Sequence, residues 1–124
     1  MILHNKGLWD KAETLNFNSF GNGSSTISKD AEESIEVVAL DDVVDANDKV
    51  TFLKMDIESA ELNALYGARR VIEKDKPRLA ICVYHKPEDI IYIASYILSI
   101  NPEYKLFLRH HSLISSFETV LYAV

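Results

Sequence analysis

The chain has 124 residues, of which 48% are hydrophobic and 26% are charged, and its formal net charge at pH 7 is −6. This balance is typical of one folded domain and excludes collagen, a coiled coil and wholesale disorder. The single cysteine cannot form an internal disulfide, which favours a reducing, cytoplasmic compartment. No apolar stretch approaches the ~20 residues of a membrane span, and the acidic balance argues against nonspecific nucleic-acid binding. We therefore expect neither a membrane nor a nucleic acid as a partner.

The first 49 residues of this single domain are acidic and rich in loops. Residues 1–50 contain ten acidic and four basic side chains, whereas residues 51–124 contain nine of each. Small polar residues gather between Ser19 and Thr26, where neither a helical nor a strand period is visible. Short strands are expected at residues 1–4, 15–20 and 34–40. A short helix is expected to follow at residues 41–44, with Asp41 as its cap.

Residues 50–124 follow a regular pattern that predicts the order β-α-β-α-β-β. The expected strands are residues 50–57, 78–84, 104–109 and 117–124. The first helix is expected at residues 60–74, with Ser59 as its N-cap and Gly67 inside it at a close helix–sheet contact. The second helix is expected to begin at Pro87 and to end at Asn101. Two successive βαβ units predict an α/β fold with a mostly parallel sheet, and the last two strands predict a terminal antiparallel hairpin.

Polar side chains lie at the carboxyl ends of the first two expected strands of this unit, residues 50–57 and 78–84. Ligands of open α/β sheets bind beyond the carboxyl ends of the strands. Adjacent parallel strands lie ~4.8 Å apart, so Asp56 and His85 are expected to face one crevice. Such a group suits acid–base chemistry or a metal ion. The residues near these two ends are Asp56, Glu58, Glu61, Tyr84, His85 and Asp89.

Each of these residues also has a purely structural interpretation. Asp56 suits a helix cap or a salt bridge, Glu58 and Glu61 suit the first turn of a helix, and His85 suits a loop. Because no closely spaced His or Cys pair is present, no metal site is assigned, and metal-assisted hydrolysis by Asp56, Glu58 and His85 is the weaker alternative. Cys82 is expected to be a small core residue. His110 and His111 are expected to point to opposite faces of a strand.

Several long segments resemble, in order, the motifs of FkbM-family methyltransferases. Residues 54–61 (KMDIESAE), with the Leu and Tyr-Gly-Ala that follow, are similar to the family segment K-x-D-x-E-G-x-E…L…G-A. Ser59 stands where that family usually has Gly. The other similar segments are residues 6–10, 40–42, 76–90, 104–112 and 118–123.

The resemblance implies a Rossmann-like fold that uses S-adenosylmethionine to methylate oxygen atoms of sugars or secondary metabolites. It makes Asp56 and His85 the candidate catalytic residues for proton removal. It makes Glu58, Glu61, Tyr84 and Asp89 the candidate acceptor-binding residues. In this fold the cofactor sits on a Gly-rich turn after the first strand, and an acidic residue ends the second strand. Neither feature is recognisable here, so we expect a truncated fold lacking those two strands, and no cofactor-binding residue is assigned.

Two functions remain open at this stage. The first is a truncated or degenerate FkbM-like methyltransferase that is inactive by itself. The second is a non-catalytic module that associates with itself or a partner through the strand at residues 50–57, whose edge loses a neighbour in the truncated fold. That edge is expected to be covered by residues 34–40, by the N-terminal segment or by a second copy of the chain in a homodimer.

Overall fold

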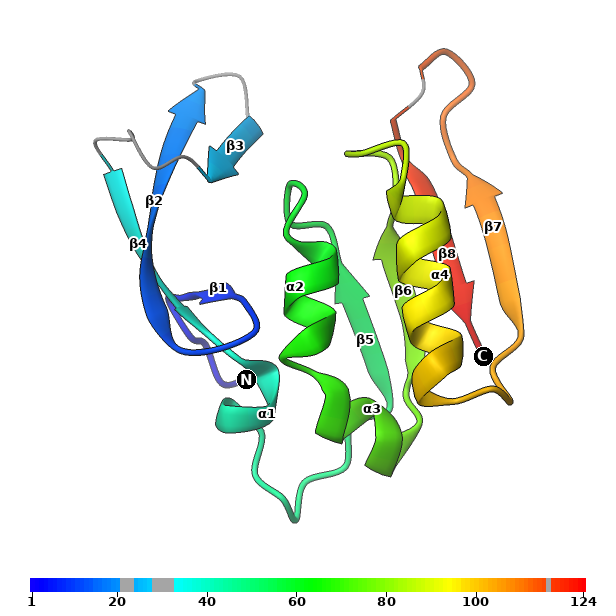
Figure 1. The fold of residues 1–124 in the computed structure, drawn as a ribbon, viewed down its shortest axis with the longest axis horizontal. Helices are drawn as coiled ribbons and strands as arrows, with labels where there is room; N and C mark the ends of the chain where they lie inside the picture. Colours follow the sequence, from blue (N-terminus) through cyan, green and yellow to red (C-terminus); the bar gives the residue numbers. More distant parts are fainter. Residues whose placement is uncertain (21–23, 28–32, 116) are drawn as a thin grey trace.

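The computed structural model describes residues 1–20, 24–27, 33–115 and 117–124, which form two four-stranded sheets (Figure 1). The first sheet has the strand order β1-β4-β2-β3 and the second has the order β5-β6-β8-β7. The strands of the first sheet are Gly7–Leu8 (β1), Glu13–Phe20 (β2), Ser24–Ile27 (β3) and Glu33–Val38 (β4). Those of the second are Phe52–Met55 (β5), Arg78–Cys82 (β6), Leu106–His110 (β7) and Thr119–Ala123 (β8). The helices are Leu40–Val43 (α1), Glu61–Tyr66 (α2), Arg69–Asp75 (α3) and Asp89–Ile100 (α4).

The first sheet agrees only partly with the sequence-based expectations. The strands expected at residues 15–20 and 34–40 are present as β2 and β4, which pair antiparallel. The strand expected at residues 1–4 is wrong, because the first strand is β1, which lies parallel to the end of β4. The polar run between Ser19 and Thr26 contains β3, so it is not all loop. Gly21, Asn22 and Gly23 of that run lie outside the described residues.

The second sheet has one parallel pair and a terminal antiparallel hairpin. β5 and β6 are parallel, whereas β8 lies antiparallel to both β6 and β7. The expected hairpin is therefore confirmed. Of the three pairs of neighbouring strands only β5–β6 is parallel, because β8 separates β6 from β7, so the described strands do not confirm the expectation of a mostly parallel sheet. The short β7–β8 connection forces an antiparallel pair, and α4 carries the chain past the position that β8 fills. Figure 1 shows β5, β6 and β7 running in one direction and β8 running in the other.

The main core lies between the second sheet and its helices. Figure 1 shows α2 and α4 on the same side of this sheet. Alternate residues of β5 differ sharply: Leu53 and Met55 are buried against the helices, whereas Phe52 is 56% exposed on the opposite face. The other buried contributors are Ala64, Leu65, Ala68, Ile72, Leu79, Ile81, Val83, Ile93, Ile97, Tyr104, Leu121 and Ala123. The helices thus cover one face of the second sheet. This packing fixes the positions of the carboxyl ends of β5 and β6.

β6 is the most buried strand of the second sheet. Its pattern is exposed at Arg78 and buried at the four residues that follow, as its continuous apolar run predicts. Cys82 is 4% exposed, and burial raises the pKa of its thiol to about 12. The expectation that Cys82 is a core residue is confirmed. α4 ends at Asn101 as expected, and among the described helices none is long and apolar enough to cross a bilayer.

The helix expected at residues 60–74 is divided in two at Gly67. A Cβ atom at Gly67 would lie 2.1 Å from the backbone oxygen of Trp9 and 3.1 Å from Ala39. The Gly67 carbonyl accepts a hydrogen bond from the Asp41 amide at 2.8 Å. Trp9 follows β1 and Ala39 follows β4, so Gly67 is where the first sheet meets the helices. A close contact at this glycine is confirmed, but the continuous helix is wrong, because incoming backbone occupies the space beside it.

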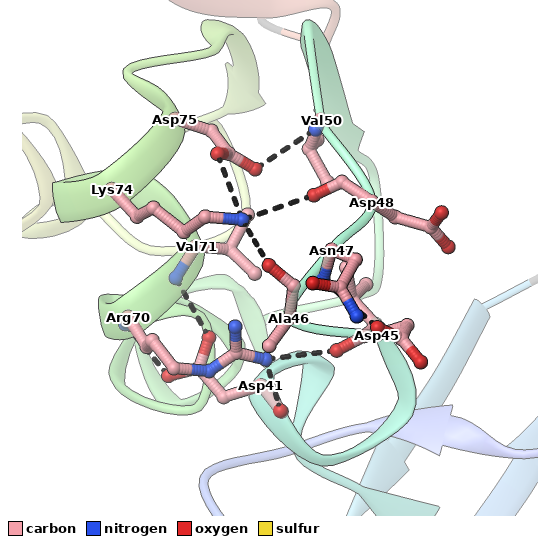
Figure 2. Close-up of polar contacts among 11 residues, drawn as sticks. Asp41, Asp45, Ala46, Asn47, Asp48, Val50, Arg70, Val71, Lys74 and Asp75 are labelled. Carbon is pink, nitrogen blue, oxygen red and sulfur yellow. Dashed lines mark hydrogen bonds and ion pairs between the residues drawn. The ribbon is translucent and has the colours of Figure 1, made fainter.

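The contact at Gly67 is one joint between the half of the chain that contains the first sheet and α1 and the half that contains the second sheet and its helices. A second joint between these two halves is polar (Figure 2). The Asp41 carboxylate accepts hydrogen bonds from the backbone amides of Arg70 at 2.7 Å and Val71 at 3.0 Å. Asp41 therefore caps α3, and the expectation that it caps its own helix is wrong, since α1 has no side-chain cap. The Arg70 guanidinium returns hydrogen bonds to the carbonyls of Asp41 and Val44. Asp75 accepts a hydrogen bond from the Val50 amide at 2.9 Å, which anchors the chain just before β5.

Candidate functional site

The carboxyl ends of β5 and β6 bring together the two residues predicted to be catalytic. Asp56 follows β5 directly, and His85 comes three residues after β6. The parallel pairing of the two strands sets these ends side by side, as the sequence predicts. His85 Nε2 lies 3.7 Å from Asp56 Oδ1 and 3.6 Å from Glu58 Oε2. His85 and the two carboxylates therefore form one cluster.

The His85 imidazole is buried within this cluster. Its side chain is 7% exposed, whereas those of Asp56 and Glu58 are 39% and 38% exposed. Its other nitrogen, Nδ1, lies 3.1 Å from Glu61 Oε1. The ring thus has a buried carboxylate on one side and two partly exposed carboxylates on the other.

Glu61 lies behind His85 rather than in the open part of the cluster. Its side chain is fully buried, and its Oε1 accepts a hydrogen bond from the Ile57 amide at 2.8 Å. That bond closes the turn between β5 and α2. The position of Glu61 in the first turn of α2 was the sequence signal, but the carboxylate points into the protein. A fully buried carboxylate that also accepts a backbone hydrogen bond has a fixed position, which suits it to orienting the neighbouring His85.

Aromatic rings form one wall of the cluster. The Tyr84 hydroxyl donates a hydrogen bond to Asp56 Oδ1 at 3.0 Å. Burial and this bond raise the pKa of Tyr84 well above its ordinary value. The Tyr84 ring lies 4.1 Å from the His85 ring and 5.9 Å from Phe117 in an edge-on contact. Sequence reasoning missed Phe117, although the predicted hairpin brings its tip to this edge of the sheet.

The turn between Asp56 and α2 has an unusual backbone. Glu58 and Ser59 have φ angles of 54° and 76°, in the left-handed region that favours glycine. This gives a physical reason for the glycine that the motif usually has at the position of Ser59. The expectation that Ser59 caps the helix is wrong, because Ala60 is at the N-cap position. The Ser59 carbonyl instead accepts a hydrogen bond from Lys86 Nζ at 3.0 Å, which links the two strand ends.

Three further polar residues do not join the cluster. Asp89 is 5% exposed at the start of α4, where burial raises the pKa of its carboxyl. Within the described residues it forms no ion pair with His85. His110 Nδ1 lies 2.8 Å from Thr119 Oγ1, and His111 Nε2 lies 3.1 Å from the Tyr122 hydroxyl. Both of these imidazoles are thus engaged within the terminal hairpin.

A hollow of about 220 Å³ lies away from this cluster, over the first sheet. Lys6 and Glu36 line it and form an ion pair at 3.0 Å. It contains no imidazole and none of the predicted site residues. The chemistry-bearing side chains are therefore at the edge of the second sheet.

Comparison with known proteins identifies the family of the chain. The model of the methyltransferase FkbM domain matches residues 4–114. A crystal structure of a methyltransferase FkbM from Methylobacillus flagellatus KT is similar, with a TM-score of 0.77 and 39% sequence identity. The match covers 98% of this chain and 28% of that chain. No curated protein matches the sequence. The chain therefore belongs to the FkbM methyltransferase family.

Proposed function

We propose that the chain supplies the acceptor side of an O-methyltransferase active site. In this proposal a hydroxyl-bearing small molecule, a sugar or a secondary metabolite, binds at the ends of β5 and β6. His85 accepts the proton of the hydroxyl that is methylated. The observation that carries the proposal is the contact of 3.1 Å between His85 Nδ1 and the fully buried Glu61. A base held by a third group is a recurrent arrangement for proton transfer.

The two sides of the imidazole have different tasks in this mechanism. Nδ1 lies 3.1 Å from Glu61 Oε1 but is not aligned for a hydrogen bond, so the mechanism requires a small rotation of the ring. With Nδ1–H then donating to Glu61, Nε2 has the free lone pair and accepts the proton. The positive charge that the ring gains is offset by the carboxylates of Asp56, Glu58 and Glu61, all within 3.7 Å of a ring nitrogen. Glu61 is a positioning residue, and Asp56 is the alternative proton acceptor.

Acceptor binding is assigned to the more exposed members of the cluster. The carboxylates of Asp56 and Glu58 accept hydrogen bonds from the hydroxyls of a polyol, and the Tyr84 ring offers a flat surface to a sugar or an aromatic group. Asp89 is proposed to contact the acceptor molecule only when its carboxyl is protonated, because its side chain is nearly buried. A cytoplasmic location belongs to the same proposal and is supported by the single, buried, free cysteine.

The methyl donor is a separate matter, because the family's cofactor is S-adenosylmethionine. Binding it requires glycines that leave room for a close approach to the backbone. Gly67 faces the backbone of Trp9 and Ala39, and Gly7 faces the side chains of Val37 and Ile35. Other parts of the chain occupy the space beside each of these two glycines, so the described residues do not form a binding site for the methyl donor. The chain spans 28% of the length of the solved relative, and we propose no turnover by this chain alone.

Ligand-detected NMR tests the acceptor site directly. A panel of monosaccharides and phenolic glycosides is screened against the chain while the His85 ring proton resonances are followed. We expect binders that shift the His85 resonances, with binding weakened in Asp56→Asn and His85→Gln and kept in the control His111→Gln. Binders that leave the His85 resonances unmoved would contradict the proposal. Calorimetry with millimolar S-adenosylmethionine is expected to give no heat.

The free edge of β5 supports a second, non-catalytic function. Among the described strands β5 pairs only with β6, and β4 lies in the other sheet, so residues 34–40 do not pair with this edge. Phe52 is 56% exposed on β5. A second copy pairing along β5 is expected to give a dimer in light scattering at micromolar concentration. Phe52→Lys is expected to abolish that dimer, whereas Phe107→Lys on β7 is the matched control. A monomer at all concentrations would exclude self-association.

A further inference from the structure

We infer that Asp56, Glu61 and His85 form a binding site for one divalent transition-metal cation. One donor atom from each residue lies within 4.8 Å of the other two. Donors that share a tetrahedral ion at ~2.0–2.2 Å lie about 3.3–3.6 Å apart, so the side chains must move inward by up to about 1.5 Å to complete the site. The inference goes beyond the proposed function, because it requires neither a methyl donor nor an acceptor.

Unpartnered buried atoms are the second observation that points to a ligand. Neither ring nitrogen of His85 makes a well-formed hydrogen bond, although its side chain is only 7% exposed. Glu61 Oε2 also has no partner, and the Glu61 side chain is fully buried. Buried polar atoms in folded proteins are nearly always partnered. One cation in contact with the imidazole and the carboxylate would partner both residues at once.

The charge around His85 also favours a cation. Three carboxylates, those of Asp56, Glu58 and Glu61, approach the imidazole within 3.7 Å. Within the described part of the chain, neither a lysine nor an arginine forms an ion pair with any of them. Lys86 is near, but its ammonium donates to the Ser59 carbonyl. Burying a carboxylate without a compensating charge is costly, and a divalent cation removes that cost.

The donor set selects the kind of cation. One imidazole nitrogen and two carboxylate oxygens suit Zn²⁺, Co²⁺ or Mn²⁺ better than Ca²⁺ or Mg²⁺, which prefer oxygen donors alone. The Asp56 side chain is 39% exposed, which leaves positions on the cation open to solvent or to a hydroxyl. A cation bound at Nε2 takes the lone pair that the proposed proton transfer uses, so His85 acts as the base only in the cation-free chain.

Titration of the chelator-treated protein with Zn²⁺ and Co²⁺ tests the inference. We expect one Zn²⁺ per chain by calorimetry, and visible Co²⁺ absorption that Zn²⁺ abolishes. Asp56→Asn, at a partly exposed position, is expected to weaken binding at least tenfold, and Glu61→Gln to do the same. The control is His110→Gln combined with His111→Gln, which removes two imidazoles outside the cluster and is expected to leave affinity unchanged.

The outcomes are decisive in either direction. Absence of stoichiometric binding, equal affinity in Asp56→Asn, or loss of binding in the His110/His111 control would each overturn the inference. If circular dichroism finds Glu61→Gln unfolded, Asp56→Asn alone decides. Because the titration contains no acceptor, a failure here leaves the proposed acceptor site standing, and a failed acceptor screen leaves the cation site standing.

Discussion

The two sheets differ in what stabilises them. The second sheet packs against α2, α3 and α4 and contributes most of the main core. Among the described side chains of the first sheet, only Val37 and Val38 at the end of β4 are buried. Figure 1 shows the first sheet beside α2, where it meets the helices at Gly67 and, through α1, at α3. The second sheet thus has its own hydrophobic core, whereas the first depends on two joints to its neighbour.

The largest expected effect comes from Gly67→Ala, which breaks the first joint. The added Cβ meets the Trp9 backbone oxygen, and backbone cannot move aside as a flexible side chain does. We expect a loss of roughly 3 kcal/mol in the free energy of unfolding, with amide exchange in β4 rising more than in β6. Gly7→Ala is the matched control, because the nearest atoms to its Cβ would be in the flexible side chains of Val37 and Ile35, and the nearest backbone atom, of Glu36, is 4.0 Å away. Equal losses in the two variants would refute this account of the joint.

Asp41→Ala breaks the second joint with a smaller effect. It removes the hydrogen bonds to the amides of Arg70 and Val71, leaving the first turn of α3 uncapped. A loss of about 2 kcal/mol is expected, at the upper end of measured cap deletions. Asp42→Ala removes the same charge from an exposed neighbour and is expected to change little. Urea denaturation measures both variants, and similar losses would mean that charge, not capping, is responsible.

Ser59→Gly acts within the second half alone and is expected to stabilise the protein. Serine at a φ of 76° is strained, and glycine adopts this angle freely. We expect a gain of about 1 kcal/mol in the free energy of unfolding, with exchange in β4 unchanged. Ser59→Ala keeps the strain and is the control. A gain in both variants would locate the effect in the hydroxyl group rather than the backbone.

Asp89→Asn has the smallest expected effect, visible as a change of slope with pH. Burial raises the pKa of Asp89 above its ordinary value of 3.8, so the folded chain retains this proton after the unfolded chain has lost it. The free energy of unfolding therefore falls as the pH rises from about 3.8 to the folded-state pKa. The variant lacks this contribution, which denaturation at a series of pH values measures. A wild-type curve parallel to that of the variant would argue against a raised pKa.

Local patterns predicted the second half of the molecule well. Apolar periodicity and turn residues gave its strand and helix order, and the strand-end rule brought Asp56 near His85. The other features depend on contacts between residues far apart in the sequence, which local patterns do not predict. The helix divides at Gly67 because of Trp9, and Asp41 caps a helix far along the chain. The pairing of β2 with β3 and β4 depends on register, which polar strands specify weakly.

For the candidate site, five of the six predicted residues converge and Asp89 does not, and the sequence did not predict how each side chain is turned. A negatively charged residue such as Glu61 is favoured in the first turn of a helix. The conformation of the turn after Asp56, however, directs the Glu61 carboxylate toward the Ile57 amide and His85. That direction follows from the left-handed backbone at Glu58 and Ser59, which single-residue preferences do not suggest. The catalytic, acceptor-binding and cation-binding roles remain predictions until the experiments above are performed.

Cys82 is a built-in probe of local unfolding around β6. This thiol sits at the end of β6, three residues before His85, and its raised pKa keeps it protonated at neutral pH. Alkylating reagents attack the thiolate, so the folded chain resists modification until β6 separates from its neighbours. The alkylation rate therefore reports how often the strand that holds His85 comes apart. Every variant described above can be ranked by this one reaction, without adding a dye or a second cysteine.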